Sequence, residues 1–284
     1  MNGSRLKYCL LILGAMLASG CGPAAVAPPD PAAPAVERYE VKFGLQPARV
    51  LRSAGASIDS VDIPALRTVF NIDQVAPERL VVRFLDSCDQ GLQGMGWAVR
   101  LREAAGVTQL TYKKRFPLRN EAETAGALKD VATARLLADH SHFDPKVEVD
   151  WGPSRATLSV TLETKLPEGP PADPRSAAVQ HAPPAMKGDA HALDALRSAV
   201  VHGPVQARRW EGRWPGKNDT LHVEVWQIGS ALAVETSFKS KDREKAAAGR
   251  EVLQKLLQKE GWLSSEESFR TDAVLKAHKP ASCP

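Results

Sequence analysis

Segment after segment of this chain alternates charged with apolar side chains. In the first of them, Arg38, Glu40 and Lys42 are separated by aromatic and aliphatic residues. Successive side chains of a strand point to opposite faces, so each segment predicts a strand with one charged and one apolar face. The charged positions carry Arg, Lys and Glu of both signs. Repeated over about eight strands, this pattern predicts a closed sheet with a charged interior that suits an anion, with or without a metal ion.

The same patterns place strands and helices in mixed order along the chain. The expected strands are 37–44, 78–86, 96–103, 107–116, 146–152, 156–165, 206–214, 219–227 and 231–239. The expected helices are 62–77, 120–139, 190–201 and 241–260, the last followed by Gly261 as a stop. Residues 167–187 are rich in Pro, Ala and Gly and predict a flexible loop, and 268–275 predict an edge strand.

A transmembrane β-barrel also alternates apolar and polar side chains and is the first alternative. Its strands need about nine to eleven residues, and its lipid-facing wall leaves no place for helices. Three of the nine strands expected here are shorter (37–44, 96–103 and 146–152), and amphipathic helices interrupt the series. Those helices bury their apolar faces most simply against the outside of a barrel. The pattern therefore favours an α+β fold, a soluble barrel covered by helices.

The first residues resemble a targeting segment rather than part of the fold. Arg5 and Lys7 precede an apolar stretch that is too short to span a bilayer. The following run, 17–21, resembles a bacterial lipobox, so we expect a signal peptide at 1–20 and lipidation, palmitate included, at Cys21. Gly22 in place of Asp favours an anchor in the outer membrane that faces the periplasm. An ordinary signal peptide cleaved near Gly20 is the alternative.

Beyond the lipidation site the chain divides into a tether, one domain and a tail. Residues 21–35 are rich in Pro and Ala and predict an extended tether, followed by a domain at 36–277 and a tail at 278–284. The formal charge of +4 falls to +2 without Arg5 and Lys7, so overall charge favours no nucleic-acid partner. An oxidising compartment would allow a disulfide between Cys88 and Cys283, but two distant cysteines do not establish one, and two unpaired thiols are the favoured alternative.

Charges that point into a barrel need partners, because buried charge is costly unless it is paired or binds a ligand. Arg matches phosphate oxygens with two hydrogen bonds, and Lys supplies a point charge. Carboxylates are hard oxygen ligands for Mg²⁺ or Mn²⁺. The lumen therefore suits a polyphosphate, alone or bridged by metal. The alternative is a set of salt bridges that neutralise each other in a wet barrel without a ligand.

The order and approximate spacing of these segments resemble a known family. The segments that carry the likeness are 39–43, 84–87, 99–102, 110–113, 221–225, 234–235, the 241–260 helix and 268–271. Together they resemble the CYTH superfamily of triphosphate tunnel metalloenzymes, which includes thiamine triphosphatases, inorganic triphosphatases and class IV adenylyl cyclases. The resemblance spans residues 36–277 and implies an eight-stranded antiparallel β-barrel, or tunnel, with a charged lumen and helices outside.

The resemblance also implies site residues. The phosphate-binding set would be Lys42, Arg100, Arg102, Lys113, Arg115, Arg209 and Arg213. The catalytic set would be Glu40, Lys42 and Lys113, and the ligands of Mg²⁺ or Mn²⁺ would be Glu40, Glu224 and Glu235. Glu148 and Asp150 offer a replacement pair of carboxylates. The expected partner is an inorganic or organic triphosphate or polyphosphate.

Two departures from the family pattern weaken the acidic half of this site. Arg38 and Ser237 stand where the family has carboxylates, and a cation at position 38 repels a divalent ion. Whether the chain is an enzyme therefore stays open. We favour a lipid-anchored protein that binds the anion and has lost catalysis; the alternative is a metal-dependent triphosphatase that hydrolyses phosphoric anhydrides.

Overall fold

A computed structural model describes residues 34–51, 57–74, 76–138, 142–213, 220–265 and 270–283. Every described helix and strand belongs to one compact unit, Pro34–Pro284. Its hydrophobic clusters consist of its own residues, so this unit serves as the folded fragment in the experiments below. The expected signal peptide, Cys21 and most of the tether lie outside the described residues. None of the described helices is long and apolar enough to cross a membrane.

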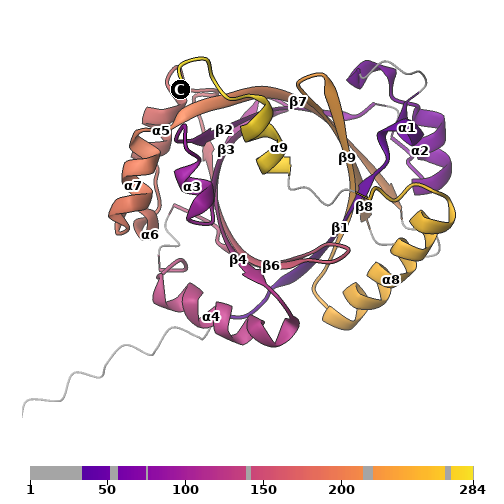
Figure 1. Cartoon of the computed structure of the whole chain (residues 1–284), viewed down its shortest axis with the longest axis horizontal. Coiled ribbons are helices and arrows are strands. Elements are labelled where there is room, and N and C mark those ends of the chain that lie inside the picture. Colours follow the sequence, from indigo (N-terminus) through magenta and orange to yellow (C-terminus); the bar gives the residue numbers. More distant parts are fainter. Residues whose placement is uncertain are drawn as a thin grey trace, which may run out of the picture. The chain divides into compact units, whose positions relative to one another are not determined.

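The alternating segments close into a barrel. Its strands are β1 (Arg38–Leu45), β2 (Glu78–Asp86), β3 (Trp97–Ala104), β4 (Val107–Leu118), β5 (Lys146–Trp151), β6 (Ala156–Leu166), β7 (Val200–Arg213), β8 (Thr220–Ile228) and β9 (Ala231–Ser240). Their order around the barrel is β1-β5-β6-β4-β3-β2-β7-β8-β9, and β9 pairs with β1 to close it. Figure 1 looks down the resulting ring.

The barrel differs from the expected eight-stranded antiparallel tunnel in two respects. The described residues form nine strands, and β1 pairs with β5 in parallel, with Arg38 opposite Glu148. Parallel neighbours need a long connection, and here about a hundred residues with three strands separate β1 from β5. Alternation along a single strand reports which face is buried, but it does not report the direction of the neighbouring strand.

Helices cover most of the barrel's outer surface. One group covers β1 and β7–β9: α1 (Pro47–Val50), α2 (Ile63–Phe70) and α8 (Arg243–Lys259). Another covers β3–β6: α3 (Gly91–Gly94), α4 (Thr124–Thr133), α5 (Pro174–Gln180), α6 (Pro184–Lys187) and α7 (Ala190–Arg197). The prediction of a flexible loop at 167–187 was wrong. Pro174 and Pro184, which suggested a loop, stand in the first turn of α5 and α6, where proline is well tolerated.

The last helix, α9 (Arg270–Ala277), lies inside the ring, where the sequence predicted an edge strand (Figure 1). Its Val274 and Leu275 are buried against Leu80, Val82 and Phe84 of β2, together with β7 and β8 residues. At this part of the wall the pattern is reversed, since apolar residues point inward. The inward apolar face of β2 is kept from water because α9 packs against it.

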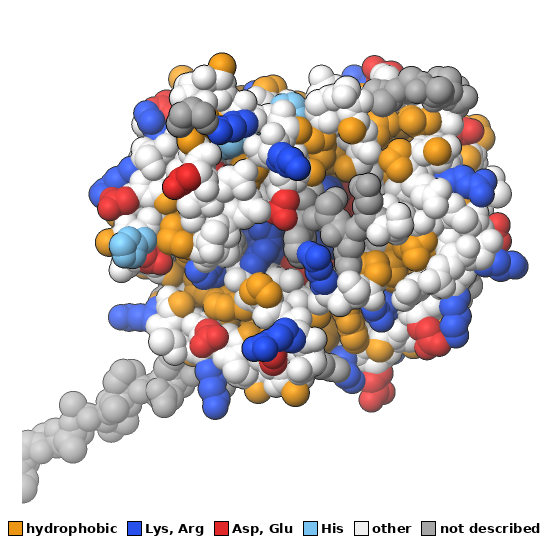
Figure 2. All heavy atoms as spheres, in the orientation of Figure 1, with side chains coloured by type: hydrophobic (Ala, Val, Ile, Leu, Met, Phe, Trp, Pro, Cys, Tyr) orange, Lys and Arg blue, Asp and Glu red, His pale blue; other side chains and the backbone are white. Residues whose placement is uncertain are grey.

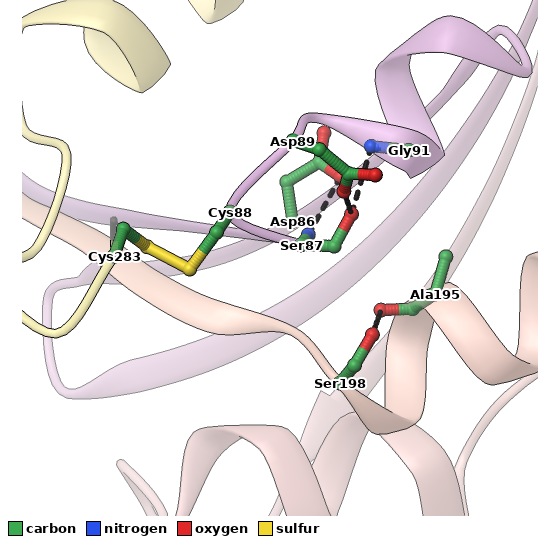
Figure 3. The surroundings of a disulfide bond; sticks show 8 residues. All are labelled: Asp86, Ser87, Cys88, Asp89, Gly91, Ala195, Ser198 and Cys283. Atoms are coloured by element: carbon green, nitrogen blue, oxygen red, sulfur yellow. Dashed lines mark hydrogen bonds between the residues drawn. A yellow bond between two sulfur atoms is a disulfide. The ribbon is translucent and has the colours of Figure 1, made fainter.

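A disulfide bond ties the end of the chain to the barrel. Cys283, six residues after α9, is bonded to Cys88, which follows β2 (Figure 3). The turn around Cys88 is ordered by its neighbours: Asp86 accepts hydrogen bonds from the backbone of Ser87, Leu92 and Gln93. The structure thus joins the two cysteines whose pairing the sequence left open, and the bond holds the C-terminal segment next to the barrel wall.

A substitution at Gly212 of β7 tests how closely α2 packs against the barrel. A Cβ atom at this position would lie 2.2 Å from the backbone oxygen of Phe70. We expect Gly212→Ala to lower the free energy of unfolding by about 1–3 kcal/mol in urea denaturation, because backbone atoms must move. Gly126, exposed in the first turn of α4, serves as the control, because a Cβ atom added there would meet no heavy atom within 4 Å. Gly126→Ala should raise stability; an equal loss in both variants would contradict this packing.

Candidate anion-binding cavity

The barrel encloses a cavity of about 480 Å³ that all nine described strands and α9 help to line. Figure 2 shows Lys and Arg side chains in and around the hollow near the centre of this face. Eleven described cations line the cavity: Arg38, Lys42, Arg100, Arg102, Lys113, Arg115, Lys146, Arg155, Arg209, Lys239 and Arg270. Six carboxylates accompany them: Glu40, Glu148, Asp150, Glu163, Glu224 and Glu235. The lining therefore carries five more positive than negative formal charges.

Asp150 of β5 is the centre of one ion network. Its carboxylate oxygens lie 2.8 Å from Nζ of Lys42 and 2.6 Å from Nζ of Lys113, and Ser159 donates a hydrogen bond of 3.0 Å to it. Lys42 also lies 2.9 Å from Glu40. The three residues predicted to be catalytic, Glu40, Lys42 and Lys113, are thus brought together, with Asp150 between the two lysines. Whether they act in catalysis stays a prediction.

The pKa values in this network show which charges are well compensated. Burial acts to raise the pKa of Asp150, but Lys113 and Lys42 hold it well below its ordinary value. Burial acts to lower the pKa of Lys42, but Asp150 and Glu40 raise it. Lys113 shares Asp150 with Lys42, and there burial wins and lowers its pKa. Lys113 is therefore a cation with less compensation than its neighbour.

A second ion network lies beside the first and joins side chains of β1, β5 and β9. Lys239 of β9 lies 2.8 Å from Glu148 and 3.6 Å from Glu40. The proposed replacement carboxylates, Glu148 and Asp150, are both paired with lysines in this way. Neither carboxylate is therefore unpaired and available to coordinate a metal ion.

Arg270 of α9 joins the two carboxylates of β8 and β9. Its guanidinium forms ion pairs with Glu224 and, at 2.8 Å, with Glu235. It also lies over the ring of Trp226, 4.7 Å from the centroid, and Trp226 donates a hydrogen bond of 2.9 Å to Glu224. Burial opposes ionisation of Glu224, yet Arg270 and the Trp226 N–H lower its pKa to about 2. For Glu235, burial and the nearby Glu224 and Glu40 outweigh Arg270 and raise the pKa.

The opposite wall, formed by β3, β4 and β6, has cations with few counterions. Among the described residues, no carboxylate forms an ion pair with Arg100, and its buried Nε has no hydrogen-bond partner. Burial, helped by the neighbouring Arg102, lowers the pKa of Arg100 to about 10. Thr111, directly opposite Arg100 on β4, has a buried hydroxyl that also lacks a partner. Arg102 donates to the neutral amide of Gln109. This wall has hydrogen-bond donors that its own residues leave unused.

No family model matches the sequence, and no curated protein matches it. Solved structures match at low identity. A Hippeastrum protein described as a candidate adenylyl cyclase with a dominant triphosphatase activity is 14% identical, over 86% of this chain and 97% of that chain, at a TM-score of 0.48. A candidate adenylate cyclase from Bacillus halodurans is 13% identical over 84% and 98%, at 0.49, and a Pyrococcus horikoshii protein is 14% identical over 84% and 99%, at 0.44. At these values we take nothing about function from their names.

Most of the predicted phosphate-binding residues line the cavity, but Arg213 does not. Lys42, Arg100, Arg102, Lys113, Arg115 and Arg209 are all in the lining. Arg209 is paired with Glu78, and Arg115 donates to Thr271 at 3.1 Å. Arg213 lies at the end of β7 with its side chain 66% exposed, 3.7 Å from Asp73. Arg213 is the last residue of β7, beyond the part of the strand that lines the cavity at Arg209.

The predicted metal ligands Glu40, Glu224 and Glu235 do not fit a divalent ion as they stand. Each carboxylate is engaged by a Lys or Arg side chain. Within the part of the chain that the structure describes, no three His, Cys, Asp or Glu side chains form a group that could hold a metal ion. Mg²⁺ or Mn²⁺ would have to displace cations of the protein itself to bind there.

Sequence reasoning missed three cavity cations: Lys146, Arg155 and Arg270. Arg270 falls in a segment that carried the family resemblance, but an edge strand was expected there. The spacing of Val274 and Leu275 after it was the available signal for a helix with one apolar face. Arg155 lies in the hairpin between β5 and β6, where alternation along a strand gives no information.

Proposed function

We propose that this protein binds triphosphate- or polyphosphate-type anions, inorganic or organic, in its basic cavity. The observation that carries the proposal is Arg100, a mostly buried arginine that faces the cavity, forms no ion pair with a described carboxylate and has a buried Nε without a hydrogen-bond partner. A buried charge of this kind is costly unless a ligand compensates it. Salt bridges alone do not account for it, because they neutralise the β1, β5 and β9 wall and leave the β3–β4 wall positive.

A polyphosphate matches this wall chemically. Its oxygens are dispersed acceptors with several negative charges, and Arg100, Arg102, Lys113 and Arg115 supply charged donors from two adjacent strands. The cavity volume of about 480 Å³ lies within the usual range for small-molecule sites. The excess of five positive charges in the lining would attract a ligand with about that charge.

Binding without turnover agrees better with the acidic side than hydrolysis does. Glu40, Glu224 and Glu235 are occupied by Lys42, Lys239 and Arg270, so none is an unpaired base for orienting water. The chain would then be a divergent member of the CYTH superfamily that keeps the anion site. The proposal includes a lipid anchor at Cys21 in the outer membrane facing the periplasm. The Cys88–Cys283 disulfide supports an oxidising compartment.

Calorimetric titration of the Pro34–Pro284 unit with sodium tripolyphosphate tests the binding proposal. We expect Arg100→Gln to weaken binding by about 10- to 100-fold, because a hydrogen bond to a charged group contributes about 1.5–3 kcal/mol. Arg213→Gln is the matched control, since this exposed arginine lies outside the cavity lining. It should leave the affinity within about twofold of wild type, as rim charges contribute little. Equal affinities for all three proteins would refute the assignment of the site.

Phosphate release from tripolyphosphate, with Mg²⁺ and with Mn²⁺, separates binding from the triphosphatase alternative. The expected rate for the wild-type unit equals that of an Arg100→Ala, Lys113→Ala double variant. A wild-type rate well above that of the double variant would show that the cavity is catalytic and that the loss of carboxylates at positions 38 and 237 is tolerated.

A further inference from the structure

Glu224 and Glu235 form a pair of carboxylates directly opposite each other on β8 and β9. Their side chains are only 16% and 18% exposed, and both line the cavity. Two adjacent, mostly buried carboxylates repel each other unless a cation lies between them. Here that cation is the guanidinium of Arg270, which reaches both of them from α9.

A pair of oxygen donors beside a polyanion cavity is the arrangement that Mg²⁺ or Mn²⁺ takes up when it bridges a protein and a phosphate. The negative charge of Glu40, which is itself paired with Lys42, also acts on Arg270. The donor set therefore suits a divalent ion, and the position that such an ion needs is taken by a side chain. Since a guanidinium has no lone pair to offer, it competes with the metal and does not coordinate it.

The fold holds Arg270 in this position. Arg270 is the first residue of α9, whose Val274 and Leu275 are buried against the inner wall. Thr271, the next residue, accepts a hydrogen bond of 3.1 Å from Arg115. The segment after the helix is bonded through Cys283 to Cys88. These contacts fix the backbone from which Arg270 extends, and its ion pairs and the Trp226 ring hold the side chain.

We propose that Arg270 is a built-in cation that occupies a latent divalent-metal site formed by Glu224 and Glu235, so that the cavity binds its anion without a divalent ion. Anion binding without a divalent ion rests on the proposed function, whereas the latent metal site does not. Arg270 then determines specificity, because it selects a metal-free polyanion over a metal–polyanion complex.

Calorimetric titration with MnCl₂, with no phosphate present, tests the latent site independently of anion binding. At the pair, Arg270→Gln should bind Mn²⁺ at least about tenfold more tightly than the wild-type unit, since a positive charge is removed from beside two carboxylates. Adding Glu235→Gln to this variant should abolish the gain. Arg208→Gln is the matched control, because Arg208 pairs with the single exposed carboxylate of Asp59 and lies outside the cavity lining.

The possible results separate the two proposals. Two results would overturn the latent site: wild-type binding of Mn²⁺ that Glu235→Gln removes, or an Arg270→Gln variant that binds Mn²⁺ no more tightly than Arg208→Gln does. If Arg270→Gln unfolds, its circular dichroism is followed with and without MnCl₂: refolding by Mn²⁺ supports the site, and no response overturns it. Tripolyphosphate titration of the wild-type unit in EDTA then tests metal-independent anion binding, whose failure concerns the proposed function alone.

Discussion

Replacing Asp150 with asparagine should lower the free energy of unfolding by about 3–5 kcal/mol, the range for breaking a buried ion pair at one partner. The asparagine side chain would keep the shape of the original but leave Lys42 and Lys113 without the carboxylate that they share. Two neighbouring cations would then face each other in a lining that already has an excess of positive charge. Urea denaturation at neutral pH measures the loss.

Asp144→Asn is the matched control for this prediction. Asp144 also pairs with a lysine, Lys146, but at 3.8 Å and with its side chain 84% exposed. Exposed pairs of this kind contribute about 0–1 kcal/mol, so this variant should stay close to wild type. Similar losses in the two variants would mean that the Asp150 network is screened by solvent. Tripolyphosphate should restore more stability to Asp150→Asn than to wild type, because it would replace the missing negative charge.

The acid limb of the stability curve should also depend on Asp150. Its folded-state pKa is held well below the ordinary value of about 3.9, so its stabilising contribution is complete above that value and is lost as pH falls through the folded-state pKa. Asp150→Asn removes this contribution at every pH. The difference in stability between wild type and the variant should therefore shrink below about pH 4; a difference that does not change with pH would contradict the low pKa.

Removing the disulfide should have an effect of similar size. Replacing both Cys88 and Cys283 with serine should lower the free energy of unfolding by about 2–5 kcal/mol, because the bond closes a loop with a sequence separation of 195 residues. The same change removes the covalent tie that follows α9. Hydrogen exchange should therefore increase in Arg270–Ala277 more than in α8, which packs on the outside of the barrel.

Reduction of the wild-type unit provides the control. Dithiothreitol should bring wild type to the stability of the double serine variant and should leave the variant itself unchanged. Unaltered exchange in α9 after reduction would show that Val274, Leu275 and the Arg270 ion pairs hold the helix without the disulfide. The disulfide would then stabilise the unit without positioning α9.

The sequence was informative where side-chain alternation reports burial. It predicted the cavity positions of Lys42, Arg100 and Lys113, because a strand between a core and a lumen must alternate. It failed where the answer depends on distant partners. The parallel pairing of β1 with β5 and the burial of α9 inside the barrel are set by packing between segments far apart in the chain. The ion pairs of Arg270 follow from that packing and were missed with it.

A crystal structure of the Pro34–Pro284 unit with tripolyphosphate tests the central claim most directly. The account predicts phosphate density inside the barrel, within hydrogen-bonding distance of Arg100 and of Lys113 or Arg102, with Arg270 still bound to Glu224 and Glu235. An anion found only on the outer surface, or a cavity in which Arg100 binds a carboxylate of the protein and no phosphate, would contradict it.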